Sequence, residues 1–195
     1  MSQIQAIVGL GNPGPDYALT RHNAGALWVA HLAARHGQSL KPEKKFQGLY
    51  SRIQVQGNDL HLLFPGTYMN RSGQSVLALS QFFKIPLNSI LVAHDELDLE
   101  TGFIRLKKDG GHGGHNGLRD IIKSFGNASD FPRLRIGISH PGHKDRVHGH
   151  VLGRLSDPEQ SKLSDLFSLL DTELDTIVSG KWDGVMNRLH SYKPT

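Results

Sequence analysis

The sequence predicts an α/β fold, a single globular domain in which a twisted mixed β-sheet carries helices on both faces. The length of 195 residues suits one domain, which we expect to span 1–195. Strand-like apolar runs alternate with segments of helical periodicity, and one pair of strand-like runs is joined by a turn. The alternation favours parallel strands, and the turn adds an antiparallel pair.

The first predicted strand, Ile4 to Leu10, is an apolar run that ends in glycines. A helix follows from His22 to His36, where Leu27, Ala30, Ala33 and Ala34 recur at helical spacing and Gly37 stands where a helix would stop.

Two further strands and a helix come next. Leu49 to Gln56 and Leu60 to Phe64 are strand-like, and Gly57-Asn58-Asp59 between them predicts a hairpin turn. The residues from Ser72 to Phe83 again have helical spacing.

The next elements are short. Ile90 to Ala93, Phe103 to Leu106 and Leu134 to Ile138 are predicted strands, and Leu118 to Phe125 is a predicted helix before Gly126.

A long helix is predicted over residues 157–180. Ser156 and Glu159 form a capping-box pattern at its start, and Gly180 ends it. Its apolar side chains trace a single face: Leu163, Leu166, Phe167, Leu170, Leu174, Ile177 and Val178.

The charge of the chain is unevenly distributed. The net charge is +4, but residues 1–154 hold 18 basic and 11 acidic side chains, whereas residues 155–195 hold 4 and 7. A basic body suggests a polyanionic partner, with nucleic acid as the leading candidate. A basic enzyme with scattered lysines explains the charge equally well.

The composition also narrows the chemistry. The chain has no cysteine, which excludes disulfides, thiolate metal sites and a thiol nucleophile. The N-terminus lacks the pattern of a signal peptide, and no run reaches the roughly 20 apolar residues that span a bilayer. We therefore expect a cytoplasmic protein without membrane contact.

The segment Gly9-Leu10-Gly11-Asn12-Pro13-Gly14 matches a dinucleotide-binding pattern, but its context does not. The prolines keep the chain irregular where that pattern needs a helix, and 17–42 contains no acidic residue for a ribose. A turn that exposes Asn12 at the end of a strand is the better interpretation.

Polar side chains gather in five glycine-rich or strand-end segments, where α/β domains build their sites. The segments are Gly11 to Gly14, Thr20 to Gly25, Thr67 to Gly73, His94 to Asp98 and Gly110 to Gly117. Taken singly, His22, Asn70 and Asn116 are equally compatible with helix capping.

Together the segments indicate water attack on an acyl centre. A neutral imidazole accepts a proton from water, and a carboxylate on its other nitrogen orients it. Asp95 is the candidate carboxylate, and asparagines suit an amide-rich substrate or an oxyanion. No G-x-S-x-G pattern supports a serine nucleophile.

A metal site is the alternative. His112-x-x-His115, His140-x-x-His143 and the His94 to Asp98 cluster together offer ligands for zinc or manganese. The pairs lie in glycine-rich loops and no H-E-x-x-H pattern occurs, so we expect no metal and no other cofactor.

Read in order, these segments resemble the bacterial-type peptidyl-tRNA hydrolase family. The matching stretches are Val8 to Gly14, Tyr17 with Thr20 to Gly25, Thr67 to Asn70 with Ser72-Gly73, His94 to Leu99, Gly110 to Gly117, and Arg133 to Ile138 with His140-Pro141-Gly142. The likeness covers essentially the whole chain. Asp109 departs from it, at a position where glycine is expected.

The resemblance implies hydrolysis of the ester between a peptide and the 3′ ribose of tRNA, which recycles the tRNA. It implies that His22 activates water and that Asp95 holds and polarises His22. Asn12 and Asn70 would surround the acyl and peptide groups, with Asn12 distinguishing N-blocked from free aminoacyl groups. Asn116 would hold the water or the peptide backbone.

Further residues are implied to bind the substrate. Tyr17, Tyr68 and Met69 would line the groove beside the 3′ end, and His115 is counted with them. The basic residues just outside the inferred site are Arg105, Lys107, Lys108, Arg133 and Arg135. The family suggests that Lys107 and Arg135 meet tRNA phosphates, a contact that adds affinity without reading sequence. A solvated strand face is the alternative for each.

The segment 139–154 combines glycines and prolines with loop-like polarity, and is either a mobile gate over the groove or a surface connection. We expect a metal-independent esterase, a monomer, that binds the acceptor stem and 3′ end of peptidyl-tRNA. A metal-dependent hydrolase and a non-catalytic RNA-binding module are the rival hypotheses.

Overall fold

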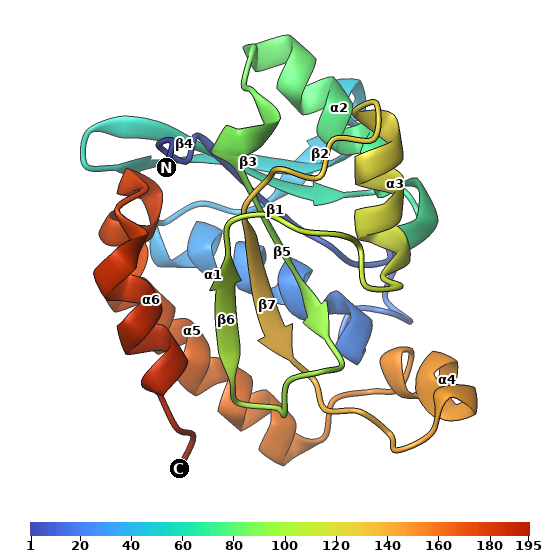
Figure 1. Cartoon of the computed structure of the whole chain (residues 1–195). Helices are drawn as coiled ribbons and strands as arrows, with labels where there is room; N and C mark the ends of the chain where they lie inside the picture. The colour runs from blue at the N-terminus through green and yellow to red at the C-terminus, as the bar shows by residue number, and fades with distance from the viewer.

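The fold is a seven-stranded sheet between two layers of helices, described here for residues 1–195 of a computed structural model (Figure 1). The strands are β1 (Ala6–Gly9), β2 (Lys41–Glu43), β3 (Gly48–Val55), β4 (Asn58–Pro65), β5 (Ile90–Glu96), β6 (Ile104–Lys107) and β7 (Arg133–Gly137). The helices are α1 (Ala24–Arg35), α2 (Ser72–Phe83), α3 (Asn116–Ser124), α4 (Val147–Val151), α5 (Asp157–Ser179) and α6 (Trp182–Ser191). Short 3₁₀ turns precede several of them, including Arg21–Asn23 and Met69–Arg71.

The sheet is mixed, as predicted. Its order is β2-β3-β4-β1-β5-β7-β6, with β1 parallel to both neighbours and β5 parallel to β7. The hairpin β3–β4 and the edge strands β2 and β6 pair antiparallel.

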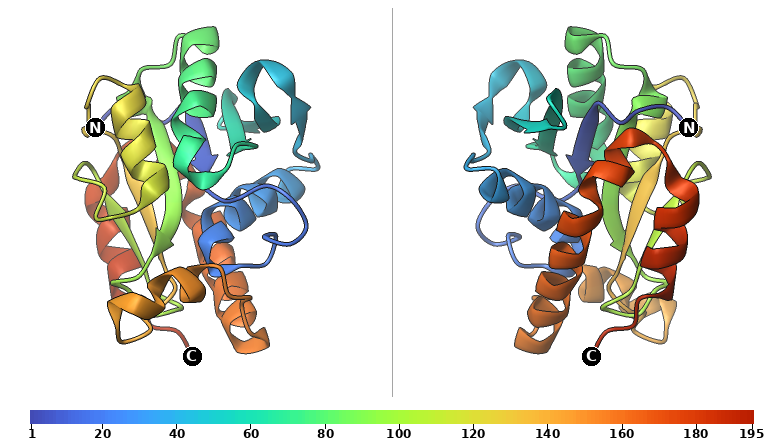
Figure 2. Two further views of the ribbon diagram at one scale, coloured as in Figure 1. Left: turned by 90° about the vertical axis from the view of Figure 1, so that its right-hand side faces the viewer. Right: turned by 90° about the vertical axis from the view of Figure 1, so that its left-hand side faces the viewer.

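Two apolar cores lie on opposite faces of the sheet. The larger contains side chains of α1, α5 and α6, and the smaller contains those of α2 and α3. In β1, Ile7 enters the first core while Ala6 and Val8 enter the second, which explains why this strand is continuously apolar. Figure 2 shows α5 and α6 together on one side of the sheet.

Most element boundaries agree with the sequence, and α2 agrees at both ends. The capping box of Ser156 and Glu159 is present, and Gly180 ends α5 with a left-handed backbone. The hairpin turn is tighter than predicted, because Gln56 and Gly57 alone form it with positive φ and Asn58 already belongs to β4.

One expected boundary was wrong, one segment of loop-like polarity contains helices, and two elements were not predicted. Strand β5 continues through His94, Asp95 and Glu96, which were expected to follow it. The segment 139–154 contains the 3₁₀ turn Lys144–Arg146 followed by α4, and its residues on either side are not helical. The sequence patterns of β2 and α6 are too weak to predict these elements. The strand β2 forms by pairing with β3, and α6 forms by packing against the rest of the fold.

Candidate active site

A cavity of about 950 Å³ opens at the carboxyl ends of β1 and β5. Asn12 follows β1, and His94, Asp95 and Glu96 are the last residues of β5. After β1 the chain runs to α1 on one face of the sheet, whereas after β5 it runs through β6 to α3 on the other. Chains that diverge in this way leave a crevice at the sheet edge, where α/β proteins bind ligands.

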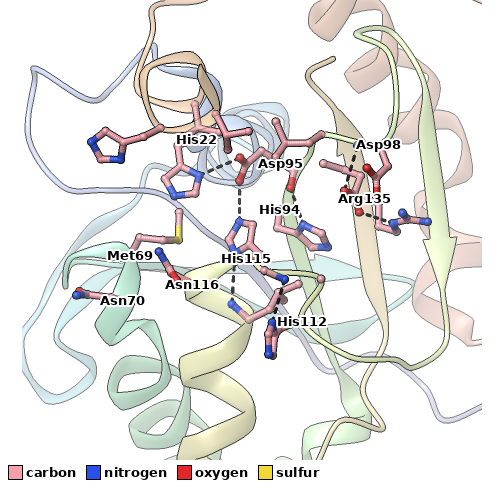
Figure 3. A pocket seen from close by; sticks show the side chains of 18 of the residues that line it. His22, Met69, Asn70, His94, Asp95, Asp98, His112, His115, Asn116 and Arg135 are labelled. Carbon is pink, nitrogen blue, oxygen red and sulfur yellow. Dashed lines mark hydrogen bonds and ion pairs between the residues drawn. The ribbon is translucent and has the colours of Figure 1, made fainter. Parts of the chain in front are cut away.

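The centre of the cavity is a buried carboxylate shared by two imidazoles. Nδ1 of His22 lies 2.9 Å from Oδ2 of Asp95, and Nε2 of His115 lies 2.8 Å from Oδ1. The side chain of Asp95 is only 3% exposed. Figure 3 shows His22 beside the carboxylate and His115 below it, each joined to it by a dashed line.

The hydrogen bonds determine the tautomers of both rings. Nδ1 of His115 accepts from the backbone N–H groups of Gly117 and Leu118, so its proton is on Nε2, which donates to Asp95. His22 likewise donates its Nδ1–H to Asp95, which leaves the lone pair on Nε2, where it has no hydrogen-bond partner in the protein.

Asp95 remains ionised in this arrangement. Burial alone raises the pKa of Asp95, but the coulombic and hydrogen-bonding influence of His115 and His22 outweighs it and lowers the pKa well below its usual range. The negative charge is therefore available to stabilise a positive charge on His22.

The same three residues are the only His and acidic side chains close enough together to suggest a metal, with ligand atoms within 4.8 Å. Ligation by Nε2 of His115 would move its proton to Nδ1, which already faces two backbone donors. The hydrogen-bonding pattern therefore favours an imidazole–carboxylate–imidazole system. Of the histidines in the metal alternative only His115 belongs to this group. Nδ1 of His112, His140 and His143 each accept from the backbone N–H two residues later.

Close backbone packing aims His22 at Asp95. A Cβ atom on Gly25 would lie 2.1 Å from the carbonyl oxygen of Ala93, so only glycine lets the first turn of α1 rest on β5. Leu10 N also donates to that carbonyl, at 3.0 Å. His22 precedes this contact by three residues and Asp95 follows it by two, which brings the two side chains together.

Asn12 presents its amide nitrogen to the cavity. Its Oδ1 accepts the backbone N–H of Met69 at 2.8 Å, and the Asn23 side chain bonds both its N–H and its carbonyl at 2.9 Å. Asn12 lines the cavity, and no protein acceptor contacts its Nδ2. This nitrogen is thus a held donor for a substrate oxygen.

His94 is neutral and buried beside the carboxylate. Its Nδ1 donates to the backbone carbonyl of Asp95 at 2.8 Å, while its Nε2 is buried without a partner. Burial and the nearby His115 lower the pKa of His94 to about 3.

The predicted basic residues divide into different environments. Lys107 is exposed at the cavity rim. Arg135 also lines the cavity, with its Nε 2.7 Å from Oε1 of Glu96 and its outer nitrogens without protein partners. Arg133 is only 2% exposed and donates to the carbonyls of Gly111 and Ser129, so it supports the glycine-rich loop.

Comparison with known proteins identifies the family of the chain. Residues 6–195 match the sequence model of the family described as peptidyl-tRNA hydrolase. The chain belongs to the peptidyl-tRNA hydrolase family. It is 64% identical over 190 residues to the peptidyl-tRNA hydrolase of Hahella chejuensis, with 97% of each chain covered, and 59% identical over 192 residues to that of Marinobacter nauticus, with 98% and 97% covered.

A solved peptidyl-tRNA hydrolase has the same fold. The crystal structure from Acinetobacter baumannii aligns with a TM-score of 0.94 and 51% identity, covering 100% of this chain and 98% of that one. None of the helices is long and apolar enough to span a membrane.

Most of the predicted site residues gather in the cavity of this peptidyl-tRNA hydrolase family member. Those that line it are Asn12, His22, Tyr68, Met69, Asn70, Asp95, Lys107, His115, Asn116 and Arg135. Tyr17 does not line it but contacts Tyr68 edge to face, with ring centroids 6.5 Å apart. Arg105 also lies outside, where its guanidinium donates to the carbonyls of Ile104 and His190.

The capping alternatives are not supported. No side-chain cap is present at the start of α1 or α2, and His115, not Asn116, caps α3. Oδ1 of Asn116 instead accepts from Arg119 at 2.8 Å.

Sequence reasoning missed the residues that hold the site in place. Asn23 lies in one of the five polar segments, but no nearby sequence pattern predicts its two hydrogen bonds to the backbone of Asn12. Glu96 was seen only as part of an acidic cluster, because its partner Arg135 is 39 residues away. Arg21 pairs with Glu159 across 138 residues.

Proposed function

We propose that His22 is the general base of this peptidyl-tRNA hydrolase, with Asp95 and His115 orienting it. Family membership provides the reaction: the chain hydrolyses the ester that joins a peptide to the 3′ ribose of tRNA. The observation that carries the catalytic assignment is the 2.9 Å contact of His22 Nδ1 with buried Asp95, which leaves Nε2 free beside the cavity.

His22, Asp95 and one water molecule are sufficient for the proposed reaction. Nε2 of His22 takes a proton from water as the water oxygen bonds to the acyl carbon, and Asp95 stabilises the imidazolium that forms. The tetrahedral intermediate then expels the 3′ oxygen of the ribose, which receives the proton from His22. The products are tRNA with a free 3′ hydroxyl and a peptide carboxylic acid, which releases its proton to water and becomes the carboxylate.

An ester needs little further assistance. The amide Nδ2 of Asn12 is placed to donate to the carbonyl oxygen or to the blocked amine of the peptide, and Asn70 and Asn116 offer exposed amides at the rim. No serine, threonine or cysteine lines the cavity, so attack by water is the route that this set of residues supports.

We assign the tRNA contacts to the rim. Lys107 and the outer nitrogens of Arg135 are the groups offered to phosphates of the acceptor stem, while Tyr68 and Met69 lie beside the 3′ end. Tyr17 supports Tyr68 from behind the cavity wall.

Three finer expectations belong to the same proposal. We expect the enzyme to act as a monomer, because only three large apolar side chains are exposed, those of Met1, Tyr68 and Phe82. We also expect the reaction to occur in the cytoplasm, because its substrate is a product of translation. Residues 139–154 would cover the groove as a gate.

The test compares N-acetylaminoacyl-tRNA with its free-amine counterpart, using the purified chain with and without EDTA. We expect turnover of the N-blocked substrate in EDTA, and a loss of about 100-fold or more in His22→Ala. His36→Ala is the matched control, since His36 is exposed at the far end of α1. A near-normal rate in His22→Ala would remove His22 from the mechanism. Activity that vanished in EDTA and returned with a divalent ion would favour the metal-dependent alternative.

A further inference from the structure

One wall of the cavity comes from the segment that ends in α4. Val147, His148, Val151 and Leu152 line the cavity together with His22. Figure 1 shows α4 beyond the carboxyl end of β5, apart from the two helical layers. This wall has little core of its own, since Val151 is the only buried residue of α4.

The wall is joined to the turn that carries His22 by backbone contacts. Thr20 and Arg154 form an isolated antiparallel bridge. Arg21 N donates to the carbonyl of Gly153 at 3.1 Å, and Leu155 N donates to the carbonyl of Leu19 at 2.9 Å. The residues just before His22 therefore lie against the residues just after α4.

The guanidinium of Arg21 strengthens this junction. Its Nε and Nη2 bind the two carboxylate oxygens of Glu159 at 2.8 and 3.1 Å, and its Nη1 donates to the carbonyl of His150 in α4 at 3.0 Å. Both charged side chains are 18% exposed. A two-pronged pair of this kind holds a guanidinium in one orientation, which aims the third nitrogen at α4.

Glu159 is itself held in place. It belongs to the capping box of α5, where its Oε2 accepts the backbone N–H of Ser156 at 2.6 Å. Hydrogen bonds from Arg21 and Ser156 lower the pKa of Glu159 against the opposing influence of burial. The long helix α5 thereby anchors Arg21, and Arg21 anchors α4.

We propose that Arg21 is a positioning residue for hydrolysis: by linking Glu159 to the carbonyl of His150, it holds the α4 wall against the turn that carries His22. The inference rests on the proposed function of the cavity. The bond between His22 and Asp95 does not involve Arg21, so loosening the wall weakens substrate binding more than the chemical step. When the binding-competent wall is populated only a tenth to a fifth of the time, the apparent affinity falls about 5- to 10-fold.

A second ion pair on α5 provides a matched control. Arg188 binds Glu173 through Nε and Nη2, both at 2.7 Å, and neither residue lines the cavity. Arg188→Gln removes the same kind of interaction from the same helix without touching α4. A purely structural role for Arg21 would make Arg21→Gln behave like this control.

The experiment measures kcat and KM for N-acetylaminoacyl-tRNA, thermal stability, and the rate of trypsin cleavage after Lys144 and Arg146, which are exposed just before α4. In Arg21→Gln we expect KM to rise about 5- to 10-fold with kcat within about twofold, and cleavage at both sites to accelerate. Arg188→Gln should leave KM and cleavage unchanged.

Two further variants test the same contact in case Arg21→Gln does not fold. Glu159→Gln keeps an acceptor for the capping box but loses the charge, so it should raise KM by a smaller factor than Arg21→Gln. Arg21→Lys should restore only part of the wild-type KM, because an ammonium lacks the fork. Unchanged KM and cleavage in folded Arg21→Gln and Glu159→Gln would overturn the proposal. That result would not contradict the proposed function of the cavity. An active His22→Ala would contradict that function, because it would show that His22 is not the general base.

Discussion

Replacing Asp95 with asparagine is expected to slow hydrolysis about 1,000-fold by placing the wrong tautomer on His22. The change preserves shape and volume but substitutes one oxygen acceptor with an NH₂ donor. In the native site both carboxylate oxygens accept an imidazole N–H, at 2.9 Å from His22 and 2.8 Å from His115. An amide satisfies only one of these two donors.

The structure decides which imidazole keeps its proton. The Nδ1 atom of His115 accepts from the N–H groups of Gly117 and Leu118, so the proton of His115 stays on Nε2. This Nε2–H then donates to the amide oxygen of the new asparagine. The NH₂ group then faces Nδ1 of His22, which must become the acceptor. The proton of His22 moves to Nε2, and the base is lost.

The size of the effect follows from the cost of the productive arrangement. To keep the lone pair on Nε2 of His22, the amide must turn its oxygen to His22 and its NH₂ group to His115. The proton of His115 then moves to Nδ1, where it faces the N–H groups of Gly117 and Leu118. Leaving two buried donors unsatisfied costs about 2–6 kcal/mol in all. The middle of this range, about 4 kcal/mol, lowers the productive population about 1,000-fold at about 1.36 kcal/mol per decade.

The assay is steady-state hydrolysis of N-acetylaminoacyl-tRNA, with ¹⁵N NMR of the imidazoles to identify the tautomer. His115→Asn supplies the decisive partner variant, since asparagine also caps helices but is too short to mimic the imidazole contact with residue 95. In the double variant Asp95→Asn, His115→Asn the new amide can turn its oxygen to His22. We expect this double variant to be at least about tenfold faster than Asp95→Asn alone, a strong departure from additivity.

Two results would refute this reasoning. The first is an Asp95→Asn enzyme within about tenfold of the wild-type kcat, since a general base contributes about 100-fold or more. The second is a double variant slower than Asp95→Asn, because independent losses would multiply and the tautomer of His115 would then have no influence on His22.

Three other predictions concern binding, packing and acid stability. Arg135→Ala should raise KM at low salt and reduce the slope of log KM against log salt by about 1, and an unchanged slope would restrict Arg135 to its pair with Glu96. Gly25→Ala should lower the free energy of unfolding, measured by urea denaturation, by at least about 1–3 kcal/mol, because its Cβ would overlap the Ala93 carbonyl. Gly149→Ala has open space around it and should leave this free energy unchanged or raise it. Burial lowers the pKa of His94 to about 3 from 6.5, so between these values the unfolded chain binds a proton that the folded chain excludes, and stability falls as pH falls. His94→Asn should flatten the dependence of unfolding free energy on pH in this window, and an unchanged slope would show that His94 is not its source.

Sequence patterns predicted much of the fold because helices and buried strands are recorded in local periodicity. The helix Ser72–Phe83 and the capped start of α5 depend on residues within a few positions of each other, and both were predicted correctly. The end of β5 was misjudged for the same local reason: polar His94 and Asp95 resemble loop residues until the shared cavity supplies their partners.

Candidate site residues were also within reach of the sequence, since amides, histidines and one carboxylate stand at strand ends and in glycine-rich turns. Their arrangement was not. Nothing local distinguishes Asn12, which faces the cavity, from Asn23, which holds it there. Arg133 and Arg135 are two positions apart on one strand and both border the cavity, yet Arg133 is buried beneath a loop whereas Arg135 is partly exposed and pairs with Glu96.

The sequence by itself determined the family, the mixed α/β fold and the type of chemistry, because these depend on residue types and short-range spacing. Only the tertiary structure decided that His115 shares Asp95 with His22, and that Arg21 reaches Glu159 and α4. These contacts join segments 20 to 138 residues apart. They exist because the strand order brings the ends of β1 and β5 together, and periodicity along the chain carries no record of strand order.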